Sequence, residues 1–120
     1  MDELKLGVVE SRFADIIWLH EPLPSRELVA LCQQELNWKK PTTYTVLRKL
    51  CERGIFRNVE GMVSSIISRE EFYAMQSERF VEETFDGSLP AFFAAFTRRK
   101  NLTAQEVAEL RRMIDSCEEG

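Results

Sequence analysis

The sequence has few of the residues that catalysis and metal binding use. Its 120 residues include a single histidine, His20, beside a proline turn, and three cysteines, Cys32, Cys51 and Cys117, which stand far apart. It has no glycine-rich phosphate loop, no G-x-S-x-G or H-E-x-x-H motif and no paired Cys or His ligands. We therefore expect no enzyme, no cofactor and no metal site. We also expect reduced, mostly buried thiols rather than disulfides.

Long apolar runs are absent as well. The longest notable stretch, Phe92-Phe93-Ala94-Ala95-Phe96, is far shorter than the roughly 18–20 residues of a membrane helix. The first residues lack the basic region and apolar region of a secretory signal. Repeats and low-complexity tracts are missing too. We expect a cytoplasmic protein with one compact core, or a small domain plus an accessory element.

Charge is unevenly distributed along the chain. The formal net charge is −4, yet the segment from Trp38 to Arg57 carries six basic residues and one acid, Glu52. A basic island in an acidic protein is typical of an electrostatic footprint on one face, as nucleic-acid binding requires. A solvated helix face that is basic by chance remains the alternative.

Hydrophobic periodicity predicts three helices in the first half. The first covers about 8–19, with Val9, Phe13, Ile16 and Ile17 on one stripe, and the segment 20–24 breaks it. Ser25 is the expected N-cap of the second helix. A third helix is expected over about 42–53 and ends at Gly54, where a left-handed cap is favoured.

The second half begins with a predicted hairpin. Residues 55–59 and 62–67 read as strands around Glu60-Gly61. Capping boxes starting at Ser68 and Thr103 open a fourth helix through about 83 and a last helix, with a break at 86–88 before a fifth helix. The predicted class is mainly α with a small β-hairpin wing: a winged helix-turn-helix followed by a helical domain.

The third helix has two chemically different sides. Thr43, Leu47, Leu50 and Cys51 fall on one side, whereas the opposite side carries Thr42, Thr45, Arg48, Lys49, Glu52 and Arg53. A helix of this kind fits the major groove of B-DNA, where threonines and cations reach base edges and phosphates. The alternative is a tri-helical module that binds another protein and not DNA.

The stretch from Trp38 to Ile55, WKKPTTYTVLRKLCERGI, resembles the W-x₃-T-x₂-T-x₃-[RK]-L-x₂-[RK]-G run of the penicillinase-repressor (BlaI/MecI/CopY-type) family of winged-helix transcriptional regulators. Trp18 and the segments 68–72 and 85–89 also look like family signatures, so the resemblance covers about residues 6–114.

The resemblance implies a winged helix-turn-helix DNA-binding domain at 1–70 and a helical dimerisation domain at 71–120. Each subunit of a homodimer would read one half of a palindromic operator in double-stranded DNA. By position it implies DNA contacts at Thr42, Thr45, Lys49 and Arg53. The helical wheel adds Arg48, and Lys39 and Lys40 are expected phosphate contacts.

Three departures from the family concern the wing and the release signal. The wing after Gly61 lacks the family's extra basic or aromatic residues, which predicts weaker wing contacts. Family repressors are inactivated by a sensor protease that cuts an Asn–Phe bond, but the matching pair here is Ala95–Phe96. Cys117 stands where a copper-responsive branch has paired Cys-x-Cys motifs, so no copper switch is expected.

The tail is rich in phenylalanine. Six of the eight phenylalanines lie between Phe72 and Phe96, and three short helices offer little of their own chain to cover them. A two-fold partner would cover them. The expected dimer contacts are Phe80, Phe85, Leu89, Phe92, Phe93, Phe96, Leu110 and Ile114. The alternative is that this cluster packs on the first helix of the same chain.

Overall fold

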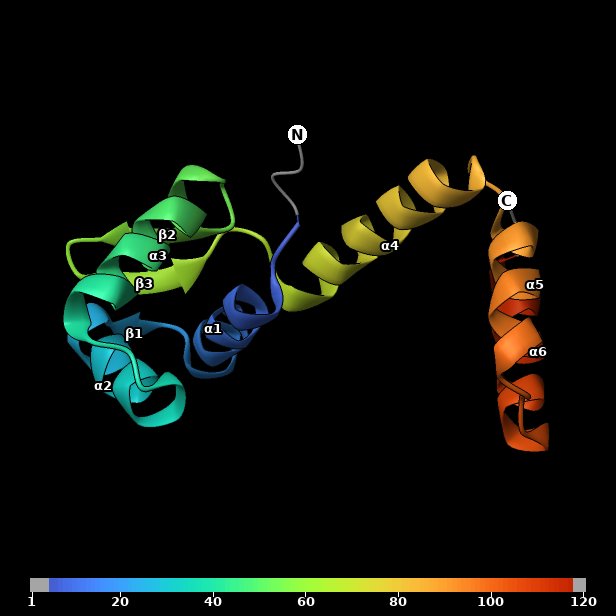
Figure 1. Ribbon diagram of the computed structural model, residues 1–120, viewed down its shortest axis with the longest axis horizontal. Helices are drawn as coiled ribbons and strands as arrows, with labels where there is room; N and C mark the ends of the chain where they lie inside the picture. Colours follow the sequence, from blue (N-terminus) through green and yellow to red (C-terminus); the bar gives the residue numbers. More distant parts are fainter. Residues whose placement is uncertain (1–4, 118–120) are drawn as a thin grey trace. The chain divides into compact units, whose positions relative to one another are not determined.

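The computed structural model describes residues 5–117, in which helices dominate and the strands are short. The elements in chain order are α1 (Val8–His20), β1 (Leu23–Pro24), α2 (Ser25–Leu36), α3 (Lys40–Glu52), β2 (Phe56–Val59), β3 (Met62–Ser65), α4 (Arg69–Phe85), α5 (Leu89–Arg99) and α6 (Ala104–Cys117) (Figure 1). This confirms the predicted class, mainly α with a small antiparallel sheet. Within residues 5–117 no helix is both long and apolar enough to cross a membrane.

The chain divides into two compact units, with the boundary between Glu78 and Arg79. Helix α4 therefore begins in the first unit and ends in the second. The functional division that we expect after residue 70 stays a prediction, and its outer ends at 1–4 and 118–120 lie outside the described residues.

The core of the first unit is built from α1, α2, α3, the sheet and the first turn of α4. Its fully buried side chains include Phe13, Ile17, Leu28, Leu50, Ile55, Phe56, Val63 and Phe72. Two sequence interpretations need correction here. Phe72 belongs to this core and not to the phenylalanine-rich tail. Val9, expected on the apolar stripe of the first helix, is 51% exposed near the start of α1. Trp18 contacts Phe72 and Phe56, and its Nε1 donates to the Ile67 carbonyl at 3.0 Å.

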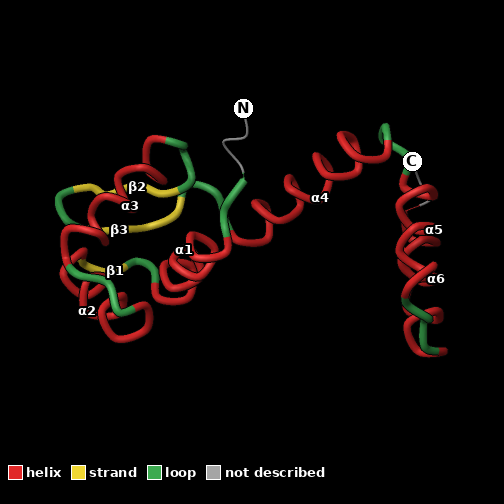
Figure 2. Tube along the Cα trace, in the orientation of Figure 1, coloured by secondary structure: helices red, strands yellow, loops and turns green. Residues whose placement is uncertain are grey.

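The segment expected only to break the first helix contains a strand. Leu23 pairs with Val63 and Pro24 with Met62, so β1 joins β3 in a three-stranded sheet of order β1-β3-β2 (Figure 2). Pro24 then serves as the N-cap of α2. The predicted N-cap role of Ser25 is wrong, because its hydroxyl hydrogen-bonds the Tyr44 hydroxyl at 2.9 Å instead of capping its own helix.

The turn signals of the sequence are confirmed around α3 and in the hairpin. Gly54 follows α3 with φ of 84°, in the left-handed region that favours glycine. Glu60 and Gly61, with φ of 51° and 84°, form the two-residue turn between β2 and β3. Positive φ at both turn residues matches the right-handed twist of the paired strands.

The second unit contains the end of α4 with α5 and α6. Ser88, expected only as part of a break, caps α5 by accepting from the Ala91 amide at 3.1 Å. Thr103 and Glu106 cap α6 reciprocally at 3.0 and 2.9 Å, as predicted. The rings of Phe80, Phe85 and Phe92 meet edge to face with centroids 5.7–6.1 Å apart. No described side chain of α5 or α6 is fully buried.

Candidate nucleic-acid interface

Helix α3 separates an apolar face from a polar one. Thr43, Leu47 and Leu50 are at most 2% exposed and pack into the core of the first unit. The predicted contact residues Thr42, Thr45, Arg48 and Lys49 are exposed on the other side. Within the described residues their side chains make no hydrogen bond or ion pair. The structure therefore brings four of the predicted residues together on one open helix face.

The amino-terminal end of α3 adds two cations. Lys39 is the N-cap and Lys40 the first residue of the helix, and both are exposed. Lys39 provides no side-chain cap, so the first-turn amides of Lys40 and Thr42 meet no capping side chain. A helix N-terminus with free amides attracts anions, and two adjacent lysines strengthen that attraction.

Arg53, the seventh predicted residue, is placed differently. Its Nη2 donates to the Lys5 carbonyl at 2.8 Å, and its Nη1 lies 3.5 Å from Glu10 Oε1. The Glu10 carboxylate also accepts from the Gly7 amide at 3.2 Å. The guanidinium therefore joins the end of α3 to the start of α1. Glu52, by contrast, is an exposed acid on the same face as Lys49.

The hairpin end is apolar. Val59 and Met62 pair across the turn and are 57% and 45% exposed. Arg57 is the cation of β2, and it lies on the same face of the sheet as Val59 because side chains alternate along a strand. The tip between the strands carries Glu60, an acid. The wing thus presents little positive charge at its end.

A hollow of about 250 Å³ lies between α3 and β2. Its lining residues are Tyr44, Leu47, Arg48, Cys51 and Asn58. Burial first, and then the charge of Glu52, raise the pKa of the Cys51 thiol, so this thiol is neutral near pH 7. Asn58 was missed from the sequence, although its alternation with Phe56 along β2 places both on the face toward the core.

Three elements meet at Ser25, the first residue of α2. Its amide donates to the Gly61 carbonyl in the hairpin turn at 2.7 Å, and its hydroxyl bonds the Tyr44 hydroxyl of α3 at 2.9 Å. These two hydrogen bonds fix the spacing between the hairpin turn and α3. The candidate interface is therefore held by hydrogen bonds among residues that are not predicted to contact DNA.

A second hollow of about 350 Å³ lies beside the end of α1 and the start of α4. It is lined by acids and by Trp18, but most of its polar groups already have protein partners. Arg69 Nε lies 3.1 Å from Asp15 Oδ1, and the Glu21 carboxylate accepts from the amide and hydroxyl of Ser65 at 2.7 and 3.0 Å. Among the described residues no group of three or more His, Cys, Asp or Glu side chains could hold a metal ion.

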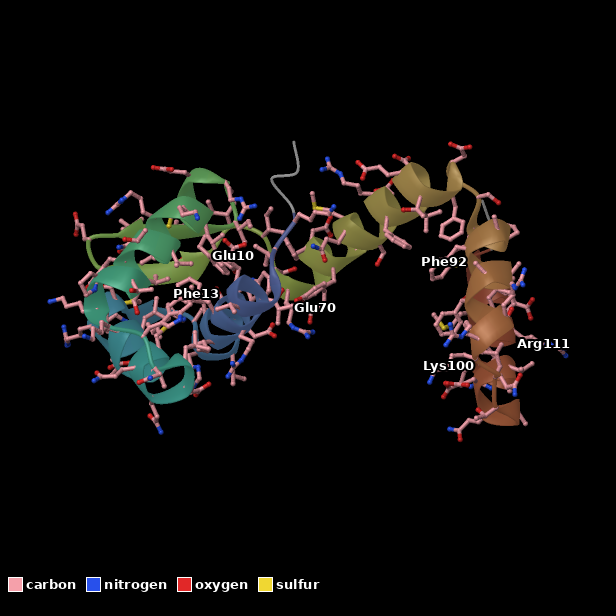
Figure 3. The ribbon with its side chains drawn as sticks, in the orientation of Figure 1. Glu10, Phe13, Glu70, Phe92, Lys100 and Arg111 are labelled. Carbon is pink, nitrogen blue, oxygen red and sulfur yellow. The ribbon has the colours of Figure 1, made fainter. Side chains whose placement is uncertain are left out.

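The predicted dimer residues all lie in the second unit. Phe80, Leu89, Phe93, Phe96 and Ile114 are 45–64% exposed. Phe85, Phe92 and Leu110 are partly buried. Phe92, which Figure 3 labels on α5, also contacts Phe96 with ring centroids 6.2 Å apart. The structure thus gathers four of the phenylalanines into one cluster and leaves a large apolar surface open. Ala95 and Phe96, the pair at the family's cleavage position, are exposed within α5.

Comparison with known proteins gives a match over almost the whole chain. The sequence model of the penicillinase repressor family matches residues 6–116. The methicillin resistance regulatory protein MecI of Staphylococcus aureus is 20% identical over 115 residues, which cover 92% of this chain and 94% of that protein. The penicillinase repressor of Bacillus licheniformis is 22% identical over 115 residues, covering 92% of this chain and 90% of that protein.

Proposed function

The chain belongs to the penicillinase repressor family, and from this premise we propose that it represses transcription as a homodimer bound to a palindromic DNA operator. The family match supports a DNA-binding transcriptional repressor rather than an enzyme. The proposal places the protein in the cytoplasm, together with the DNA that it binds.

The open face of α3 carries the proposal. It presents Thr42, Thr45, Arg48 and Lys49 opposite a buried apolar face, with Lys39 and Lys40 at the helix start. We assign Thr45 to the base edges of the major groove and Arg48 to the backbone at the groove edge. The lysines and the amino-terminal turn are assigned to phosphates. Arg53 supports this face indirectly, because its guanidinium binds the Lys5 carbonyl and the Glu10 carboxylate and so fixes the end of α3.

The homodimer follows from the apolar surface of the second unit. Leu89, Phe93 and Ile114 are 62%, 45% and 64% exposed, and a second copy of the chain would cover such a surface symmetrically. Two copies related by a two-fold axis present two α3 helices, so each reads one half-site of a palindrome.

Selection of bound sequences from a random duplex library by the purified full chain tests the proposal. The expected result is a palindrome whose half-site spacing reports the dimer geometry. A Lys49→Ala variant should bind the selected duplex more weakly, with a salt slope shallower by about 1.8, because each subunit of the dimer loses one phosphate contact. Lys100→Ala, which removes an exposed lysine of the second unit, is the matched control and should leave both quantities unchanged.

Two outcomes would overturn parts of the proposal. If no sequence is enriched even at low salt, the chain is not a DNA-binding repressor. If a single, non-repeated half-site is enriched, the chain binds DNA without the two-fold symmetry that we propose. Binding of a protein instead, abolished by Phe93→Ala but not by Lys49→Ala, would favour an interaction module.

A further inference from the structure

We propose that Asn58 of the wing and Arg48 of α3 together hold one backbone phosphate of the bound duplex. This inference rests on the proposed function and deepens it. It gives the wing a role in DNA binding although the wing end is apolar and carries Glu60.

The register of the sheet places Asn58 on the side of α3. Asn58 pairs with Val63, which is fully buried, and directly opposite residues in a sheet share a face. Phe56 on the same strand is also fully buried on that face. Arg57 and Val59 alternate with these residues and lie on the other face. Asn58 is nevertheless exposed, because it lies near the hairpin end, beyond the buried core.

The hollow between α3 and β2 offers unused hydrogen-bond donors. Arg48 and Asn58 both line it, and within the described residues neither side chain has a hydrogen bond or ion pair. Arg48 provides up to five donors and Asn58 two. No acidic side chain is among the lining residues. Donors without an opposing carboxylate select an anion, and a guanidinium paired with an amide suits phosphate oxygens.

The remaining walls of the hollow suit the carbon part of a nucleotide. Leu47, the ring of Tyr44 and the neutral Cys51 thiol complete the lining. A phosphodiester places a deoxyribose beside its charged oxygens, so apolar walls next to donors fit the backbone of DNA.

The two elements that carry these donors, α3 and the wing, are tied to each other by hydrogen bonds. The Tyr44 hydroxyl is bonded to Ser25, whose amide binds the Gly61 carbonyl of the wing turn. Arg48 also lies on the flank of the exposed face nearest β2, one turn along the helix from Tyr44. With α3 in the major groove, this flank faces the groove edge, where the backbone runs and not the base pairs.

A double-mutant cycle on the full chain tests whether the two residues share one phosphate. Binding of the selected duplex is measured for Arg48→Ala, Asn58→Ala and the double variant. We expect Asn58→Ala to lose roughly tenfold in affinity, as for a hydrogen bond to a charged group. The double variant should lose clearly less than the product of the two single losses, because each single change already weakens the same contact.

Salt dependence separates the two contributions. Arg48→Ala should reduce the salt slope by about 1.8, one phosphate per subunit, whereas Asn58→Ala should leave it unchanged, because asparagine carries no charge. Arg57→Ala is the matched wing control on the opposite face of β2, and it should show no coupling to Arg48→Ala.

A change on the DNA side keeps the test independent of protein folding. Neutral methylphosphonate links are placed at matching positions of the two half-sites, one pair at a time, and one pair should abolish the effect of Asn58→Ala and of Arg48→Ala alike. Separate positions for the two residues, or additive losses, would overturn the inference.

Other outcomes identify different failures. If the wild-type chain binds no duplex, the proposed function fails first. If it binds and Asn58→Ala is neutral, only the shared phosphate contact fails. Saturable binding of inorganic phosphate at Asn58 that the duplex does not displace would also overturn the inference, because the hollow would then be a site for the free anion.

Discussion

Two threonines of α3, two positions apart, have opposite surroundings. Thr43 is fully buried, and its hydroxyl oxygen makes no hydrogen bond of ordinary geometry. Its neighbour is the Cys32 thiol, which is only a weak hydrogen-bonding group. Thr45 is exposed on the face that we assign to DNA.

We expect Thr43→Val to stabilise the fold by about 1 kcal/mol, because valine keeps the shape and removes a buried hydroxyl without a partner. Urea unfolding followed by circular dichroism measures the change, and duplex affinity should stay the same. The control Thr45→Val should do the reverse, with unaltered stability and weaker duplex binding. A loss of stability in Thr43→Val would show that the hydroxyl has a partner in solution.

The cysteines should differ sharply in reactivity. Burial of Cys32, together with the charge of Glu35 and against the effect of Thr43, raises the pKa of its thiol to about 11. Thiolate is the reactive form, and Cys117 is exposed. At pH 8 a maleimide reagent should therefore label Cys117 and leave Cys32 unmodified, as measured by peptide mass spectrometry.

The raised pKa also has a consequence for stability. The folded state binds the Cys32 proton more tightly than the unfolded state. The contribution of the protonated thiol to the free energy of unfolding is therefore complete below the ordinary thiol pKa. It is lost as pH rises toward about 11. In Cys117→Ser, labelling of Cys32 should appear only when urea unfolds the chain. Rapid labelling of folded Cys117→Ser at Cys32 would contradict the buried position.

Which of these side chains could be predicted depended on how far away their partners lie. The helical wheel placed Thr43 inside and Thr45 outside, because both environments are set by α3 itself. It also placed Arg53 on the polar side, but no local pattern shows that Lys5 and Glu10 bind its guanidinium. Those partners lie more than 40 residues earlier in the chain.

The same distinction holds for helices and strands. The caps at Ser68 and Thr103 and the turn at Gly61 were predictable, because each signal lies within a few residues of the structure that it forms. Strand β1 was not, because its two residues include a proline and its partner β3 lies about 40 residues later. Packing of the first turn of α4 on Trp18 likewise decides that Phe72 belongs to the first core.

The junction between α3 and the hairpin depends on one glycine. Gly54 has φ of 84°, and a Cβ added there would meet nothing within 4 Å. The cost of a side chain is therefore conformational and not steric crowding by neighbours. We expect Gly54→Ala to destabilise the fold by about 1 to 2 kcal/mol, measured by urea unfolding.

Gly54→Asn is the matched control, because asparagine tolerates the left-handed region better than alanine. It should lose clearly less stability than Gly54→Ala, although its side chain is larger. Equal losses in both variants would mean that size, and not backbone conformation, limits this position.

Across the chain, the two units differ in how they bury apolar surface. The first closes a core with fully buried side chains from helices and strands, whereas α5 and α6 contribute none among the described residues. The sequence indicated that the second unit has more phenylalanines than its own short helices can bury. It could not show what covers them, because a partner copy leaves no local signal in one chain.

The double variant Phe93→Glu/Ile114→Glu tests the proposed dimer in the full-length chain. Both side chains are exposed, so the monomer should keep its fold and helical circular dichroism. In an apolar two-fold interface, however, four buried unpaired charges would prevent association. By sedimentation we expect the wild-type chain to be a dimer at micromolar concentration and the variant a monomer.

Val8→Glu is the control, since Val8 is an 81% exposed apolar side chain of the first unit and should not affect association. A palindrome binds a dimer through two linked half-sites, so the monomeric variant should bind it at least 10²-fold more weakly. A single half-site should bind the variant about as well as the wild type, because α3 is unchanged. A folded wild-type monomer at micromolar concentration would refute the dimer, and equal palindrome binding by both chains would show that the half-sites act independently.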